Sequence, residues 1–116
     1  MTKKTEAKAT RAATLLYHVA KEKTSGWDAA HSGLCAEAER LREGVYDALY
    51  TEDGRKVGAA TRRGLLFMEK NRSAVTVLAK ATLSSIETAM FPEFLRSSLC
   101  WGGWVTFLEW AGLSVE

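Results

Sequence analysis

The chain of 116 residues has few of the residue types that mark several protein classes. It contains one proline, nine glycines and two cysteines, while apolar residues make up 47% of it. This composition excludes collagen-like, low-complexity and disordered chains. Two cysteines, Cys35 and Cys100, are too few for a disulfide framework, and the first residues lack the apolar run of a signal peptide. We therefore expect a cytoplasmic protein with a single domain over residues 1–116.

The sequence also lacks the motifs of common enzymes and metal-binding proteins. It contains no phosphate-binding loop, dinucleotide fingerprint or nucleophile elbow. His31 and Cys35 would share a helix face, but no CxxC or HxxxH pair accompanies them, so a zinc site is not expected. Cys–His catalysis is disfavoured too, because neighbours on one helix seldom meet in the required geometry. We expect no catalytic residues, no metal and no cofactor.

Helix-forming residues are abundant, and they predict an all-α protein. Apolar residues recur in steps of three and four over residues 4–24, 27–50 and 60–90, which is the spacing of one helix face. The last of these intervals predicts either one long helix or two helices that meet near Asn71. Residues 1–8 are expected to form a frayed basic arm. Together these patterns predict a compact bundle of four to five helices.

Asp53-Gly54 is the clearest turn, and it leaves a second fold class open. Asp-Gly is a strong hairpin signal, so an α+β fold with one small hairpin pairing residues 45–51 with 55–61 is an alternative. The unbroken apolar stripe from Leu34 to Leu49 instead favours a loop between two helices. We therefore prefer the helical loop.

The segment 94–113 is apolar on nearly every side and holds three of the four tryptophans. Pro92, the only proline, is expected to open this helix. The uncharged part has twelve residues, too few for a membrane span, which needs about 20. Such a helix is buried in its own core, shared with a partner or laid on a membrane surface. We expect burial and self-association as a homo-oligomer, with an interface formed by Trp101, Trp104, Phe107, Leu108 and Trp110.

The net charge of +2 conceals an alternation of sign along the chain. Successive blocks carry net charges of +4, −5, +6 and −3, for residues 1–26, 27–54, 55–80 and 81–116. Helices of opposite charge can complement one another inside a bundle. Alternatively, the basic segments can form one patch for nucleic acid, although no known DNA- or RNA-binding motif accompanies them. That patch would consist of Lys3, Lys4, Lys8, Arg11, Arg55, Lys56, Arg62, Arg63, Lys70 and Arg72.

These features predict a non-enzymatic protein-interaction module, such as a small helical adaptor, inhibitor or assembly subunit. It would self-associate through the tryptophan-rich helix. The alternative is a nucleic-acid-binding protein that uses the basic segments 3–11 and 55–72, and a membrane-surface protein has less support. A short, proline-poor chain without enzyme motifs is also compatible with a viral, phage or plasmid accessory protein.

Overall fold

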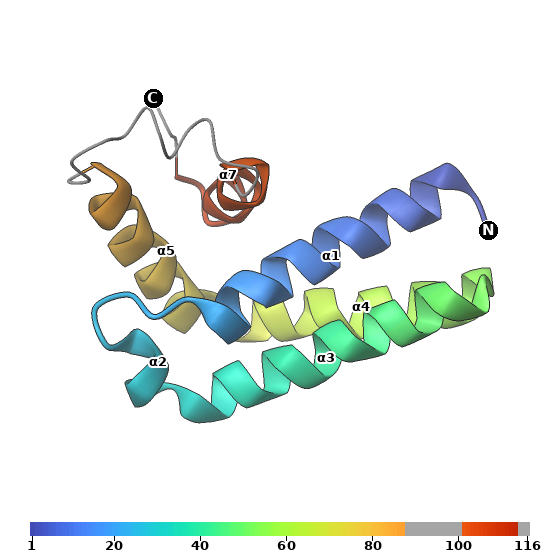
Figure 1. The fold of residues 1–116 in the computed structure, drawn as a ribbon, viewed down its shortest axis with the longest axis horizontal. Helices are drawn as coiled ribbons and strands as arrows, with labels where there is room; N and C mark the ends of the chain where they lie inside the picture. The colour runs from blue at the N-terminus through green and yellow to red at the C-terminus, as the bar shows by residue number, and fades with distance from the viewer. Residues whose placement is uncertain (88–100, 114–116) are drawn as a thin grey trace.

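The computed structural model describes residues 1–87 and 101–113, and these residues form an all-α bundle, as the sequence predicts (Figure 1). No strand occurs in these ranges. The described helices are α1 (Lys3–Lys21), α2 (Trp27–Ala30), α3 (Ser32–Thr51), α4 (Gly54–Lys70), α5 (Arg72–Glu87) and α7 (Trp101–Trp110). They outnumber the four to five expected, because the predicted helix over 27–50 divides at His31 into α2 and α3.

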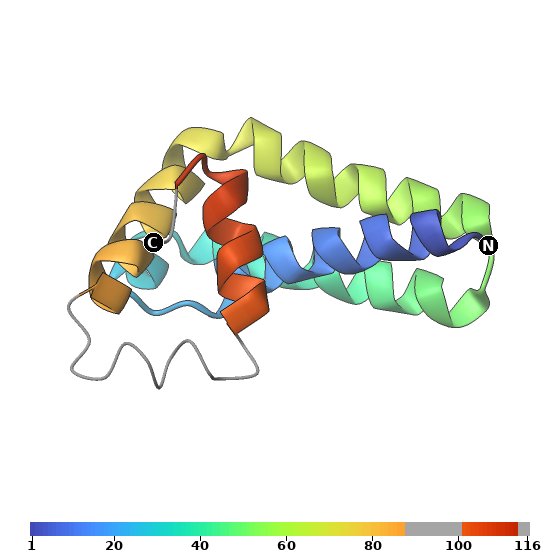
Figure 2. The same cartoon turned by 90° about the horizontal axis from the view of Figure 1, so that it is seen from above.

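Helices α1, α3 and α4 form the centre of the bundle. In the view from above, α1 lies between α3 and α4 (Figure 2). The side chains that fill this centre recur at helical spacing, so each helix turns one apolar face inward. Fully buried members include Ala9, Leu16, Ala38, Val45, Val57 and Met68.

Helices α1 and α4 run in the same direction and approach each other closely. A Cβ at Gly54 would lie 4.0 Å from the Cα of Met1, so the two helices begin at the same end of the bundle (Figure 1). Farther along α4, a Cβ on Gly64 would lie 2.9 Å from Cδ1 of Leu16, closer than real Cβ contacts come. The absence of a side chain at Gly64 thus allows the contact. Two basic segments are brought side by side as a result.

The Asp53-Gly54 turn joins two helices, so the hairpin alternative is wrong. Glu52 adopts a left-handed conformation with φ of 56°, which ends α3. The Asp53 carboxylate then accepts hydrogen bonds from the backbone N–H groups of Arg55 and Lys56, at 2.9 and 3.4 Å. An aspartate that caps a helix satisfies N–H groups that the helix itself leaves unpaired. This local cap outweighs the hairpin preference of Asp-Gly.

Two further helix boundaries matter for the expectations from sequence. One settles whether the interval 60–90 begins as one helix or two, and the other corrects the expected frayed arm. Residues 60–87 form two helices, α4 and α5, which meet at Asn71; the side-chain amide of Asn71 donates to the Phe67 carbonyl at 2.9 Å. At the start of the chain, the Thr2 hydroxyl accepts from the N–H of Thr5 at 3.2 Å and caps α1. The expected frayed arm over residues 1–8 is therefore helical from Lys3 onward.

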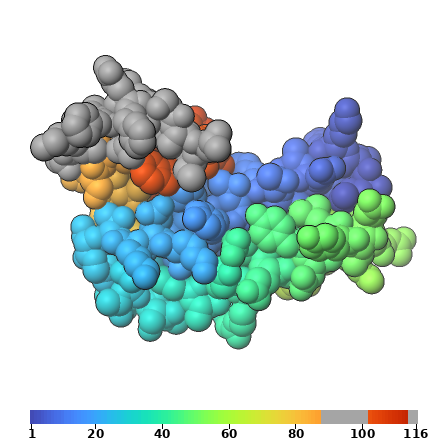
Figure 3. All heavy atoms as spheres, viewed as in Figure 1, coloured from blue at the N-terminus to red at the C-terminus, as the bar shows by residue number. Residues whose placement is uncertain are grey.

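Helix α7 covers the carboxyl half of α1, and their atoms adjoin in the space-filling view (Figure 3). The Phe107 ring stacks on the buried His18 ring, with centroids 5.1 Å apart. The Trp27 indole donates to the Ala74 carbonyl at 3.0 Å and ties α2 to α5. The expected helix start at Pro92, like Cys100, lies outside the described residues.

Candidate functional site

Most of the predicted interface residues lie inside the protein's own core. Phe107 and Leu108 are fully buried, and Trp110 is 9% exposed. Trp104 is half-buried at the edge of the core. Trp101 is the first residue of α7, and its side chain lies outside the described part of the chain. Helix α7 therefore directs these described side chains toward α1 and α5.

The basic residues predicted to bind nucleic acid lie, in contrast, mostly at the surface, and most of them have no acidic partner. Of the ten predicted for nucleic acid, only Arg72 makes an ion pair within the described residues. The other nine are exposed: Lys3, Lys4, Lys8, Arg11, Arg55, Lys56, Arg62, Arg63 and Lys70. Helices α1 and α4 thus present uncompensated positive charge.

The acidic helix α3 does not neutralise this charge. Among the described residues, its one ion pair with another helix joins Lys21 to Glu39, at 3.7 Å. Its remaining pairs lie within α3, where Arg42 binds Glu39 at 2.6 Å and Arg40 binds Glu37. The hydrogen bond from Arg42 lowers the pKa of Glu39, with further contributions from the charges of Arg42 and Lys21. The carboxylates of α3 thus pair mainly with arginines of α3.

Arg72 instead makes its contacts within the protein and links three helices. Its guanidinium lies over the Trp110 ring, 4.1 Å from the centroid, and donates to the Trp110 carbonyl at 3.0 Å. It also binds Glu69 on the preceding helix. These contacts connect the junction of α4 and α5 to the end of α7. Arg72 is accordingly set apart from the nine unpaired cations.

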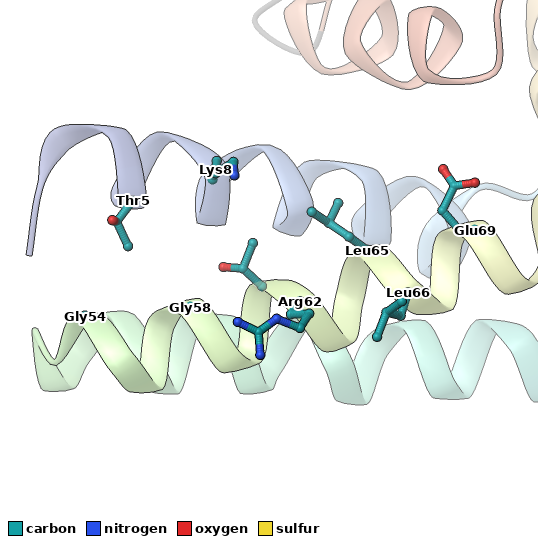
Figure 4. A pocket seen from close by; sticks show the side chains of 9 residues that line it. Thr5, Lys8, Gly54, Gly58, Arg62, Leu65, Leu66 and Glu69 are labelled. Atoms are coloured by element: carbon teal, nitrogen blue, oxygen red, sulfur yellow. The ribbon is translucent and has the colours of Figure 1, made fainter.

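A groove between α1 and α4, here called the α1–α4 groove, collects part of the positive charge. It has a volume of about 430 Å³ and no lining residue from α3. Lys8 of α1 and Arg62 of α4 lie on its opposite sides (Figure 4). Farther along α4, Leu65 and Leu66 form an apolar section. The complete lining is Thr5, Lys8, Gly54, Gly58, Thr61, Arg62, Leu65, Leu66 and Glu69.

Thr61, which lines this groove, has a hydroxyl without a hydrogen-bond partner. The residue is 6% exposed, and its Oγ1 contacts no donor or acceptor. Threonines in helices commonly donate to the carbonyl four residues earlier, as Thr10, Thr14 and Thr82 do here, each at 2.9 Å. A buried hydroxyl left unpaired costs about 1 to 3 kcal/mol. Nothing in the sequence distinguishes Thr61 from these other threonines.

A second groove lies on the other side of α4, between α3 and α4. Leu34 and Phe67 contribute to its apolar lining, and Arg63 and Lys70 contribute positive charge. Its one acidic residue, Glu37, pairs with Arg40. The exposed side chains of Arg55, Lys56, Arg62, Arg63 and Lys70 are here called the basic face of α4. Leu66, 62% exposed, lines both grooves, so α4 stands as a basic ridge between them.

The remaining cations of α1 are less concentrated. Lys3 and Arg11 line a third groove, between α1 and α7, together with Glu6 and Glu109. Because two carboxylates balance the two cations of this groove, it is a weaker site for a polyanion than the other two, each of which has two cations and one carboxylate. The strongest concentration of positive charge among the described residues is therefore the basic face of α4 with Lys8.

The residues considered for metal binding or nucleophilic chemistry are placed elsewhere. Within residues 1–87 and 101–113, no three histidine, cysteine or acidic side chains gather as a metal site would require. His31 stacks on the Trp27 ring at 4.3 Å, and its Nδ1 lies 2.9 Å from the Trp27 carbonyl. Burial, followed by the charge of Asp28, raises the pKa of the Cys35 thiol. A thiol with a raised pKa is a poor nucleophile at neutral pH.

Comparison with known proteins gave no match among protein-family models, curated proteins or solved structures. In the described part of the chain, no helix combines the length and apolarity needed to cross a bilayer.

Proposed function

We propose that this protein binds nucleic acid through the basic face of α4 and Lys8 of the adjacent α1. The observation that carries the proposal is the set of exposed cations without acidic partners on two parallel, neighbouring helices. Charges in such an arrangement add, and the phosphates of a nucleic acid are the polyanion that they would meet. Binding would be directed to the backbone, because contacts to phosphate carry no sequence information.

Self-association through the tryptophan-rich helix is the function expected first from sequence, and it has less support. Phe107 and Leu108 are enclosed by the same chain and have no surface to offer a second copy. Trp104 retains partial exposure and is the residue on which that proposal would rest. The exposed and uncompensated charge of α4 has no comparable internal role, so it favours nucleic-acid binding.

The test is the salt dependence of binding to labelled 20-nucleotide DNA, single-stranded or duplex, measured by fluorescence anisotropy. The wild-type protein should bind both, with an affinity that falls steeply between about 50 and 200 mM salt, since each phosphate contact releases counterions. The triple variant Arg62→Gln, Arg63→Gln, Lys70→Gln should lose about tenfold or more in affinity. Its slope of log affinity against log salt should be shallower by about 2 to 3.

The control variant removes the same charge from other surfaces. Lys23→Gln, Arg40→Gln and Lys80→Gln are exposed substitutions outside α4, and they change the net charge by the same three units. This variant should keep nearly all of the wild-type affinity and slope. Equal losses in the two triple variants would show that net charge alone drives binding, and absence of salt-sensitive binding would end the proposal.

A further inference from the structure

The α1–α4 groove has a feature that general electrostatic attraction does not require. Its lining includes Thr61, whose hydroxyl is buried and has no hydrogen-bond partner, next in sequence to the exposed Arg62. A hydroxyl left without a partner inside a protein is destabilising, and such groups call for an explanation. A ligand oxygen that accepts from this hydroxyl would supply one.

The charges around Thr61 indicate which chemical group would supply the ligand oxygen. Lys8 and Arg62 lie on the two sides of the groove, and Glu69, its one acidic lining residue, is bound by Arg72. Two cations and a hydroxyl donor suit a phosphate group, which offers several strong acceptors and negative charge. An uncharged ligand would form no ion pair with Lys8 or Arg62.

Next along the groove is an apolar section, which is followed by Glu69. Leu65 and Leu66 lie one helical turn beyond Thr61 and Arg62, a distance of about 5.4 Å along α4. In a nucleotide, the sugar separates the phosphate from a flat base by a comparable span. The volume of about 430 Å³ falls within the range of small-ligand sites, about 300 to 1,000 Å³. Shape and chemistry thus agree with a single nucleotide unit.

We propose that the α1–α4 groove binds one nucleoside phosphate unit, with the phosphate at Lys8, Thr61 and Arg62 and the base against Leu65 and Leu66. This inference rests on the proposed function and names single-stranded nucleic acid as the preferred ligand. The bases of a single strand are free, so one nucleotide can enter the groove. In a duplex the bases are stacked and paired, so no base is free to enter the groove. The full-length protein should therefore prefer single strands.

The central test is Thr61→Val, which removes the hydroxyl but keeps the shape. Its affinity for a 12-nucleotide single strand should fall about tenfold, the effect of one hydrogen bond to a charged group, with an unchanged salt slope. Affinity for a 12-base-pair duplex should stay at the wild-type value. Thr61→Ser should bind like wild type. Thr82→Val, which changes another buried threonine on α5, serves as the matched control.

Each result decides between the two proposals. Equal affinity for single strand and duplex, or wild-type binding by Thr61→Val, overturns the groove while leaving the basic face of α4 in place. If neither oligonucleotide binds, a titration with adenosine monophosphate, followed by NMR, decides. Shifts of the Thr61 and Gly58 amides that Thr61→Val abolishes would then assign the groove to free nucleotides. No shifts would overturn the groove as well as the proposed function, which the absence of oligonucleotide binding has already overturned. A loss of binding in which Thr61→Ser fails to recover affinity also counts against the groove.

Discussion

Gly64 and Thr61 lie one turn apart on α4, at the surface between α4 and α1, and both are buried. At Gly64, α1 packs so closely that any side chain there would meet Leu16. Thr61 lies where the helices leave space for a groove. Two positions on one helix face thus determine where the parallel helices touch and where they remain apart.

We expect Gly64→Ala to destabilise the protein although alanine favours helix. The added Cβ would lie 2.9 Å from Cδ1 of Leu16, a fully buried side chain, and relieving such overpacking costs about 1 to 3 kcal/mol. The helix preference of alanine over glycine returns about 1 kcal/mol. The free energy of unfolding, measured in urea, should therefore fall by about 1 kcal/mol.

Gly44→Ala provides the matched control for that prediction. A Cβ at Gly44, in the middle of α3, would meet nothing within 4 Å. This variant should gain up to about 1 kcal/mol from helix preference alone. If Gly64→Ala is as stable as Gly44→Ala, the two helices do not approach closely at Gly64.

Some properties of single residues can be predicted from the sequence, whereas others depend on distant packing. The exposure of Lys8, Arg62 and Arg63 is readable from their positions outside the apolar stripes. The absence of a partner for Thr61 is not readable, because the chain around it resembles that around Thr82, whose hydroxyl is satisfied. The difference arises from packing against a distant segment, which one sequence does not display.

At the scale of helices, periodicity and turn residues predicted most of the elements. The stripes over 4–24 and 60–90 correspond to α1 and to the pair α4 and α5, and Asp53 begins a helix as its residue type favours. The break at His31 was not foreseen, since the apolar stripe continues across it. The direction of α1 relative to α4 also escaped prediction, because it follows from contacts between residues far apart in sequence.

Helix α7 depends on Arg72, and we expect Arg72→Lys to lower the midpoint of thermal unfolding by a few degrees. A lysine cannot lie flat over the Trp110 ring while also donating to the Trp110 carbonyl and binding Glu69. Arg62→Lys, at an exposed position without an acidic partner, should leave the midpoint unchanged. Both substitutions keep the net charge, so the slope of log affinity against log salt should change little. A fully stable Arg72→Lys protein would show that the contact to α7 is dispensable.

At the scale of the whole molecule, pH should act through carboxylates paired with arginine. The pKa of Glu39 is lowered mainly by the hydrogen bond from Arg42, and that of Glu69 mainly by the hydrogen bond from Arg72. A carboxyl with a lowered pKa in the folded state adds stability above its unfolded pKa, about 4.3. That contribution is lost as the pH falls through the lowered folded value.

We therefore expect the thermal midpoint to be steady above about pH 5 and to fall as the pH is lowered toward 3. Glu39→Gln should make this decline shallower, because its side chain no longer takes up a proton on unfolding. Glu43→Gln, at an exposed position on the same helix, is the control and should follow the wild-type curve. Identical acid curves for wild type and Glu39→Gln would contradict the prediction.

The separation of charge across the bundle has a kinetic consequence. Helix α3, rich in carboxylates, contributes no residue to the α1–α4 groove, whereas α1 contributes Lys8 and α4 contributes Arg62. The side of the molecule that carries this groove would therefore attract a polyanion more strongly than the exposed carboxylates of α3 would. Because an approaching polyanion would repel one side and attract the other, the field would rotate the protein before contact, and α4 would meet the strand first. Added salt would weaken this steering and slow capture more than it hastens escape.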